Sequence, residues 1–290
     1  MSLICGIDEA RRGPIIGPMV MCGAFIEEKD MQKLTSLNPK DSKLLTPQER
    51  EELYSPITKI LKDFTVFIIH PEEIDRAVNG KGGLNLNKLE AHKQAEILNT
   101  SKPDKAIIDC PSNNIQSYRA YLKNQLHNKK IELVLEHHAE CYPLVAAASI
   151  IAKVTGDAEI EKIKKQIGID FGSGYMSDPK TVAFLQKYYE LHSAIFRKSW
   201  FPYQEMLNKK FQKSLSDFTQ FLKEDQKHHG HTIEDIKKLE EFGFHFDTSK
   251  SEQEIAIMKG PCTVILYKNG KLLIQGNADA KKNVEKLLGM

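Results

Sequence analysis

LICGIDEARRGP, residues 3–14, is the stretch that decides the fold prediction. Its first five residues are apolar or small, which is typical of a buried strand, and two acids, Asp8 and Glu9, follow at once. Residues 9–17 are rich in Arg, Gly and Pro and predict a turn, and residues 18–26, PMVMCGAFI, again have the composition of a strand. These residues predict a hairpin with two carboxylates at the end of its first strand.

The chain beyond the hairpin alternates between helical and strand-like patterns. Residues 46–61 begin with Thr-Pro and early acids, which indicates a capped helix, and residues 142–167 form a long pattern rich in small residues that suits packing against a sheet. The order of the patterns predicts an α/β fold, a mixed sheet flanked by helices on its faces. Further helices are expected at 84–99, 114–128 and 180–192, and further strands at 63–70, 106–111 and 130–138.

The composition is that of an ordinary globular protein. Of the 290 residues, 41% are hydrophobic and 28% are charged, with a formal net charge of +2, which excludes a disordered chain and gives only weak support to nucleic-acid binding. The five cysteines lie singly, with no CxxC pair, as is typical of reduced thiols in a cytosolic protein. No apolar run approaches the ~20 residues of a membrane-spanning helix, and no signal segment precedes the first strand. We therefore expect a cytoplasmic protein without a membrane partner.

A change in composition divides the chain into domains. Residues 1–212 are expected to form the larger α/β domain with a helical extension, and residues 213–235, rich in Lys, Gln and His, a linker. Residues 236–290 predict a small C-terminal α/β domain, in which the turn KNG at 268–270 joins two strands of a hairpin.

Acidic residues stand at or just beyond three strand-like segments. Asp8 and Glu9 end the first strand, Asp109 ends the run AIID, and Glu140 follows the strand at 130–138. Because unpaired buried charges are costly, four carboxylates at one sheet edge would require cations between them. Two Mg²⁺ ions roughly 3.5–4 Å apart are the usual solution and suit in-line displacement at phosphorus. In a regular strand Asp8 and Glu9 point to opposite faces, so both reach one site only if the strand twists or ends there.

These residues belong to a longer set of motifs that resembles the type 2 ribonucleases H. GIDEARRGP is similar to the family's opening motif GIDEAGRGP, and GSGYMSDP resembles the archaeal-type ribonuclease HII branch. The resemblance implies a ribonuclease H-like mixed sheet that hydrolyses the RNA strand of RNA–DNA hybrids with Mg²⁺ or Mn²⁺, leaving 5′-phosphate and 3′-hydroxyl ends. Further matching segments are DSKLLT (41–46), LNLNKLEAH (84–92), IIDCP (107–111), EHHAECYPLVAAASIIAKV (136–154) and FGSGYMSDPKT (171–181).

The resemblance implies one two-metal site. Its catalytic metal ligands would be the carboxylates Asp8, Glu9, Asp109 and Glu140. Glu140 departs from ribonuclease HII, which usually has Asp at this step, and matches the related ribonuclease HIII group. A longer carboxylate still binds a metal ion, so the ligand set is kept.

The resemblance also implies how the substrate is held. Arg11, Arg12 and Gly13 lie where the family reads the ribose 2′-hydroxyl, and Tyr175 matches the tyrosine that stacks on the sugar next to the cleavage point. Arg11 stands where the family has Gly, and arginine hinders both a positive φ and a close approach of the backbone to the sugar. Periodicity alone would more often make Tyr175 a core residue, but the Gly-Ser-Gly before it favours an exposed loop. Ser149 is equally well explained as a small helix-packing residue. The remaining expected contacts, to phosphates or the substrate backbone, are Lys43, Ser149 and Lys153.

The C-terminal segment carries a second resemblance. Residues 262–288 resemble the small substrate-binding domain of ribonuclease HIII, which is similar to half of a TATA-box-binding protein. In that group the domain precedes the catalytic part, whereas here it follows. An alternative is a generic α/β appendage used for oligomerisation. The side chains expected near a hybrid backbone are Tyr267, Lys268, Asn269, Lys271, Gln275 and Asn277.

Three functions remain open from the sequence. The leading one is a monomeric, metal-dependent ribonuclease H that acts on extended RNA tracts in RNA–DNA hybrids. The first alternative is ribonuclease HII-type incision 5′ of single ribonucleotides embedded in duplex DNA, with Arg11 accommodated by a shifted loop. The second alternative is a non-catalytic hybrid-binding protein whose site has decayed, although all four carboxylates are retained.

Overall fold

The computed structural model describes residues 2–209, 231–249 and 251–290. The chain forms two compact units that divide between Tyr203 and Gln204. The first unit contains all the catalytic motifs, and the second contains the C-terminal segment. Most of the predicted linker at 213–235 lies outside the described residues.

A five-stranded mixed sheet organises the first unit, which confirms the predicted fold class. Its strands lie in the order β3-β2-β1-β4-β5, with β1 antiparallel to β2 and parallel to β4. The hairpin β1–β2 predicted from the opening stretch is therefore the centre of the sheet. The strands are β1 (Leu3–Ala10), β2 (Met19–Glu27), β3 (Asp63–Ile69), β4 (Lys105–Asp109) and β5 (Glu132–Glu136).

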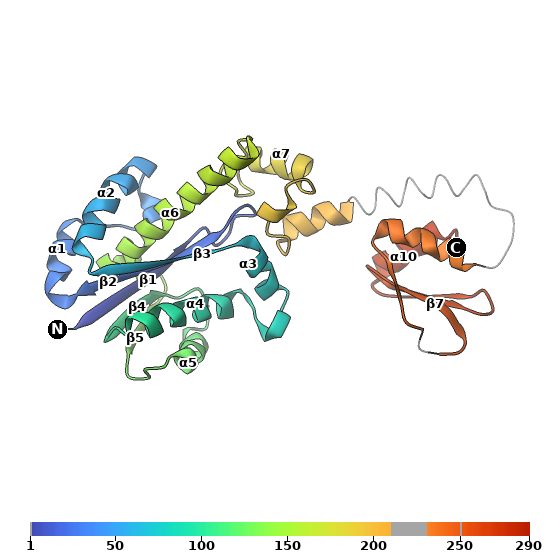
Figure 1. The fold of residues 1–290 in the computed structure, drawn as a ribbon, viewed down its shortest axis with the longest axis horizontal. Coiled ribbons are helices and arrows are strands. Elements are labelled where there is room, and N and C mark those ends of the chain that lie inside the picture. The colour runs from blue at the N-terminus through green and yellow to red at the C-terminus, as the bar shows by residue number, and fades with distance from the viewer. Residues whose placement is uncertain (1, 210–230, 250) are drawn as a thin grey trace. The chain divides into compact units, whose positions relative to one another are not determined.

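Helices cover both faces of this sheet (Figure 1). One face packs on α1, α2 and the long helix α6, and the other packs on α3, α4 and α5. The short helices α1 and α3 were not predicted, because each spans two turns or fewer and gives little periodicity. The helices are α1 (Met31–Ser36), α2 (Pro47–Ile60), α3 (Pro71–Val78), α4 (Leu86–Ser101), α5 (Ile115–Gln125), α6 (Pro143–Ile167) and α7 (Pro179–Tyr188).

Small residues let α6 lie close to the central strand. A side chain on Gly6 of β1 would place its Cβ 2.7 Å from the backbone carbonyl of Leu144, near the start of α6. The alanines at 146–148 are also fully buried. The small-residue-rich half of α6 therefore packs on the sheet as predicted, and it brings Ser149 beneath β1.

The side chains of strand β1 alternate between the two faces of the sheet up to its last residue. Cys5 and Ile7 face the core around α3, α4 and α5, whereas Ile4 and Ala10 face the core around α6. The sequence left open whether the strand ends at its two acids; it does not, because regular pairing with β2 continues through Ala10. Asp8 and Glu9 are therefore directed to opposite faces of the sheet.

The second unit is a four-stranded antiparallel sheet with helical segments packed on it. The predicted KNG turn joins β8 to β9, with Gly270 at a φ of 74°. Strand β6 was not predicted, since three residues are too few to show alternation. Asn277 caps α10 by accepting a hydrogen bond from the Ala280 N–H at 2.7 Å. The elements are α9 (Ile233–Lys237), β6 (His245–Asp247), β7 (Glu254–Lys259), β8 (Thr263–Tyr267), β9 (Leu272–Gln275) and α10 (Ala278–Leu287).

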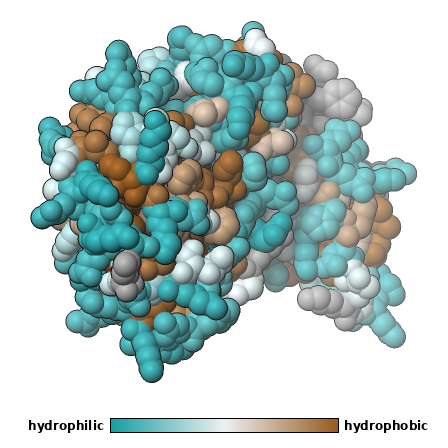
Figure 2. All heavy atoms as spheres, turned by 60° about the vertical axis from the view of Figure 1, so that its left-hand side comes forward, coloured by the Kyte–Doolittle hydropathy of each residue, from teal (hydrophilic) through white to brown (hydrophobic). Residues whose placement is uncertain are grey.

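The surface is mostly polar. Hydrophilic side chains predominate on the face shown in Figure 2. Leu44, beside Lys43, is an exception, with 74% of its surface exposed. No helix in the described part of the chain has both the length and the hydrophobicity needed to cross a membrane.

Candidate active site

Three acidic side chains meet at the edge of the first sheet. The parallel pairing of β1 with β4 matches Ile7 to Ile108, so the next residues, Asp8 and Asp109, lie beside each other. Glu140 approaches from the short turn Ala139–Cys141 that precedes α6. One oxygen from each of Asp8, Asp109 and Glu140 lies within 4.8 Å of the other two.

Neighbouring groups hold these carboxylates in place. Asp8 accepts hydrogen bonds from the Ser149 hydroxyl and, at 2.7 Å, from the backbone N–H of Glu9. Asp109 accepts from the backbone N–H of Ala139 at 3.1 Å. Lys43 lies 3.4 Å from Glu140 and is exposed at the rim of the site.

Burial and mutual repulsion keep negative charge unfavourable at this edge. The pKa of Asp8 is raised from 3.8 to about 7: burial is the largest cause, the charges of Asp109 and Glu140 also raise it, and the Ser149 hydrogen bond lowers it. A bound divalent cation would reverse this balance by compensating the carboxylates.

Glu9 lies on the other side of β1 and is not among the three. Its oxygen Oε2 is fully enclosed and has no hydrogen-bond partner among the residues that the structure describes. Burial raises the pKa of Glu9 well above its usual value, and the neighbouring Glu90 of α4 raises it further. Glu9, the fourth predicted ligand, therefore lies beside the cluster with one oxygen that accepts no hydrogen bond from the described residues.

The residues present fit a divalent metal ion. Carboxylate oxygens are the ligands that Mg²⁺ and Mn²⁺ prefer, and the three-oxygen cluster has only Lys43, at its exposed rim, as an ion-pair partner among the described residues. The cluster opens to a pocket of about 560 Å³ that Lys43, His137 and His138 also line. Space and donors for metal ions and a phosphodiester therefore meet at one place.

The turn after β1 is fixed by a residue that the sequence analysis missed. Arg197 is wholly buried and donates hydrogen bonds to the carbonyls of Arg11 at 2.6 Å, Arg12 at 2.5 Å and Gly17 at 3.1 Å. Burial lowers the pKa of Arg197 to about 9. Trp200 donates to the Gly13 carbonyl at 3.1 Å. The one feature of the sequence that could have drawn attention to Arg197 is its position three residues before Trp200, the chain's only tryptophan.

Within this turn, Arg12 and Gly13 face outward whereas Arg11 does not. Arg12 pairs with Glu90 of α4 at 2.6 Å and remains partly exposed. Gly13 is exposed, and a Cβ there would lie 3.9 Å from the ring of Tyr175. Arg11 is only 5% exposed, so its side chain is enclosed by the protein. Its φ is 61°, which costs a non-glycine residue about 1 kcal/mol, so the backbone takes the positive φ that arginine was expected to hinder.

The other expected substrate contacts also differ in their exposure to solvent. Lys43 is exposed and Tyr175 is half-buried beside Gly13. Ser149 is buried, and its hydroxyl lies 2.8 Å from that of Ser42 in addition to its bond to Asp8. Lys153 is half-buried and pairs with Asp157 at 2.6 Å. The interior positions hold the site together, and the exposed ones line its opening.

A mixed sheet with converging carboxylates at adjacent strand ends, open to a pocket, is the arrangement expected of a metal-dependent nuclease. A family model for ribonuclease HII matches residues 5–202, which spans nearly the whole first unit. The ribonuclease HII of Pyrococcus furiosus is 46% identical over 202 residues, covering 68% of this chain and 88% of its own length.

Solved structures agree with this assignment. The crystal structure of ribonuclease H2 from Pyrococcus horikoshii superposes with a TM-score of 0.64 at 40% identity, over 70% of this chain and 96% of that one. The Bst ribonuclease HIII, solved in complex with Mn²⁺, has a TM-score of 0.59 at 22% identity, over 71% of this chain and 70% of that one, and so shares the fold.

The chain belongs to the ribonuclease HII family. It is a ribonuclease H, an endonuclease that acts on RNA–DNA hybrids. Family membership thus favours a hydrolase over the non-catalytic alternative.

The raised pKa of Asp8 gives a test of the acidic cluster. The folded protein binds this proton more tightly than the unfolded chain does, so the proton's stabilising effect is lost as the pH rises through about 7. In EDTA at pH 8, Asp8→Asn should therefore unfold about 3 °C or more above the wild type, and the difference should shrink at pH 5. Circular dichroism melts measure it. Asp63→Asn, at the exposed start of β3, is the control, and equal pH dependence in wild type and Asp8→Asn would contradict the account.

Proposed function

We propose that this ribonuclease hydrolyses the RNA strand of RNA–DNA hybrids with two divalent cations, Mg²⁺ or Mn²⁺, and leaves 5′-phosphate and 3′-hydroxyl ends. The observation that carries the proposal is the cluster of Asp8, Asp109 and Glu140 oxygens within 4.8 Å of one another. When bound, the cations supply an activated water and compensate the charge on the leaving oxygen.

Four carboxylates are proposed as the catalytic metal ligands. Asp8, Asp109 and Glu140 offer oxygens that already converge. Glu9 would complete the set through its unpartnered Oε2, whose lack of a hydrogen bond in the interior is otherwise costly. Ser149 orients Asp8 for this role, because its hydroxyl donates to that carboxylate.

The exposed residues around the site are proposed to hold the substrate. Gly13 and the ring of Tyr175 lie next to each other, so one sugar could contact both, and its 2′-hydroxyl would be read there. Arg12 and Lys43 add positive charge beside a phosphate backbone. Lys153 lies farther from the opening and contributes through its pair with Asp157.

Removal of one carboxylate tests the metal site. Asp109→Asn should lower kcat by about 1,000-fold or more, because it removes a ligand on which the reacting atoms depend, while the affinity for hybrid changes by less than about threefold. Gel cleavage and fluorescence anisotropy measure the two quantities. Asp63→Asn is the matched control and should behave as the wild type. Full activity of Asp109→Asn would show that the proposed site is wrong.

A second substrate is favoured by the conformation of the turn. We propose that single ribonucleotides within duplex DNA are also cut, on their 5′ side. Arg11 holds the positive φ that glycine would adopt, and its side chain is buried, so it does not block the exposed backbone at Gly13. This observation weakens the sequence-based preference for extended RNA tracts.

A comparison of two substrates decides this point. In Mg²⁺ and then Mn²⁺, the protein should cut both a full RNA–DNA hybrid and a DNA duplex with one ribonucleotide, with kcat/KM values within about tenfold. Denaturing gels locate the cuts. Cleavage of the hybrid alone would support the RNA–DNA hybrid as the substrate and would reject the proposal that single ribonucleotides in duplex DNA are cut.

The second unit is proposed to bind the substrate backbone. We propose that the turn between β8 and β9 is its contact surface, because Lys268 and Lys271 project two positive charges from a sheet edge. Such contacts raise affinity without reading sequence, since phosphates are uniform along the strand. Tyr267, Asn269 and Gln275 lie on or next to the same two strands.

Charge removal at this turn tests the role of the second unit. The double variant Lys268→Ala/Lys271→Ala should raise KM for hybrid by about threefold to tenfold at low salt, with kcat nearly unchanged, because the lost contacts act equally on substrate and transition state. Lys282→Ala, on the exposed surface of α10, is the control. An unchanged KM would reject the surface, and truncation after Lys209 would then show whether any of the second unit assists binding.

A further inference from the structure

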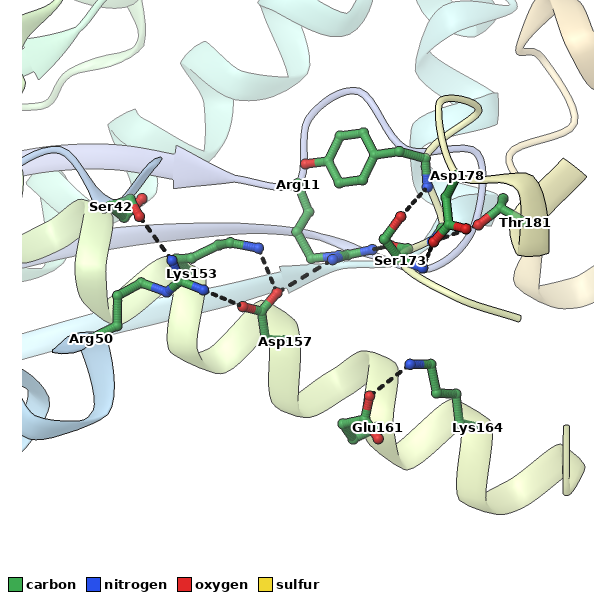
Figure 3. A network of polar contacts seen from close by, with 12 residues as sticks. Arg11, Ser42, Arg50, Lys153, Asp157, Glu161, Lys164, Ser173, Asp178 and Thr181 are labelled. Carbon is green, nitrogen blue, oxygen red and sulfur yellow. Dashed lines mark hydrogen bonds and ion pairs between the residues drawn. The ribbon is translucent and has the colours of Figure 1, made fainter. Parts of the chain in front are cut away.

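Asp157 of α6 joins three cations from separate parts of the first unit (Figure 3). Its Oδ1 lies 2.6 Å from Lys153 Nζ and 3.4 Å from Arg11 Nη1, and its Oδ2 lies 3.3 Å from Arg50 Nη2. The cluster borders a groove of about 540 Å³ that is lined by different residues from the pocket at the acidic cluster. One carboxylate thus neutralises part of a concentrated positive charge outside the metal site.

These ion pairs form a network with two arms, Arg50 and Arg11. The first arm, Arg50, holds the loop that carries Lys43. Arg50 is buried in α2, and its Nη1 donates to the carbonyl of Ser42 at 2.9 Å and to that of Leu45 at 2.6 Å. Ser42 in turn contacts Ser149, the residue that donates to Asp8. Arg50 therefore fixes both ends of the short segment in which Lys43 lies.

The second arm holds the loop that carries Tyr175. Arg11 Nη2 donates to the Ser173 carbonyl at 2.7 Å, and the guanidinium carbon lies 5.6 Å from the centre of the Tyr175 ring. Two glycines leave room for this side chain. A Cβ on Gly156 would lie 2.8 Å from Arg11 Cδ, and a Cβ on Gly174 would lie 2.9 Å from Arg11 Nη2. The surroundings are therefore shaped around an arginine at position 11.

Electrostatics makes Asp157 the link between the two arms. Arg11 and Arg50 are both buried guanidinium groups, and each has Asp157 as its only carboxylate partner among the ion pairs of the described residues. Without that carboxylate, three positive side chains would repel one another in a poorly solvated space. The backbone carbonyls that Arg11 and Arg50 hold belong to two loops far apart in sequence, so a shift of either arginine would move a loop.

We propose that Asp157 is a positioning residue of the ribonuclease, which sets the placement of the Lys43 loop relative to the Tyr175 loop through Arg50 and Arg11. The inference rests on the proposed function, in which Lys43 and Tyr175 contact the substrate. Asp157 is not one of the three carboxylates of the acidic cluster. Its effect is therefore on the binding of the hybrid and on the fit of its sugar rather than on the metal ligands.

Substitution of the carboxylate tests the proposal. Asp157→Asn should raise KM for an RNA–DNA hybrid by about tenfold, the size of loss expected when substrate-contacting loops shift by less than 1 Å, and should change kcat by less than about threefold. Glu161→Gln is the matched control, because Glu161 lies one turn farther along α6 and pairs with Lys164 at 2.8 Å without contacting either loop. An unchanged KM in folded Asp157→Asn, or a loss confined to kcat, would overturn the proposal.

A double-mutant cycle keeps the proposal testable if Asp157→Asn does not fold. Arg11→Gly and Arg50→Met each remove one arm, and if one carboxylate couples the arms, their combined loss in kcat/KM should be at least about threefold smaller than the product of the single losses. A combined loss equal to that product would mean that the arms act independently and would overturn the proposal. Failure of the wild-type protein to cut the hybrid would instead count against the proposed function.

Discussion

Repulsion among three converging carboxylates, two of them buried, is the constraint on which the rest of this structure depends. Asp8, Asp109 and Glu140 have oxygens within 4.8 Å of one another, in an environment that raises the pKa of Asp8 to about 7. Such a cluster is maintained only by a rigid frame. The parallel pairing of β1 with β4 fixes the two aspartates, and the close approach of α6 to Gly6 brings Ser149 and the turn of Glu140 to the same edge. A divalent cation bound by these carboxylates would compensate their charge.

Around this centre, arginines hold the loops that are proposed to contact the substrate. Arg197 binds three carbonyls of the turn that follows β1, and Arg12 is anchored on Glu90 of α4. Arg11 and Arg50 brace two further loops through Asp157. Arg197 and Arg50 each donate to two or more backbone carbonyls at once, and Arg11 donates to one, which suits the fixed, planar set of donors of a guanidinium group. Arginines inside the protein thus shape the loops around the acidic cluster.

The sequence predicts the strands and helices of the first unit better than the arginine contacts that hold its loops. The hairpin, the capped helix α2 and the Ala-rich start of α6 follow from local patterns, because each depends on neighbouring residues. The approach of Asp109 to Asp8 follows once both are placed at ends of central strands. The burial of Arg11 could not be predicted in this way, since its partners Asp157 and Ser173 lie 146 and 162 residues away. Likewise, the role of Arg197 depends on contacts 180 to 186 residues distant, and the separation of Glu9 from the cluster depends on β1 continuing to Ala10.

The most direct test of the central claim is the dependence of cleavage on a divalent cation. Protein freed of metal with EDTA is mixed with an RNA–DNA hybrid whose RNA strand carries an end label, and products are resolved on a denaturing gel before and after addition of Mg²⁺ or Mn²⁺. The account predicts an intact RNA strand in EDTA and its cleavage, with the DNA strand preserved, once either ion is added. Cleavage of the RNA strand at the same rate in EDTA would contradict a mechanism built on carboxylate-held metal ions.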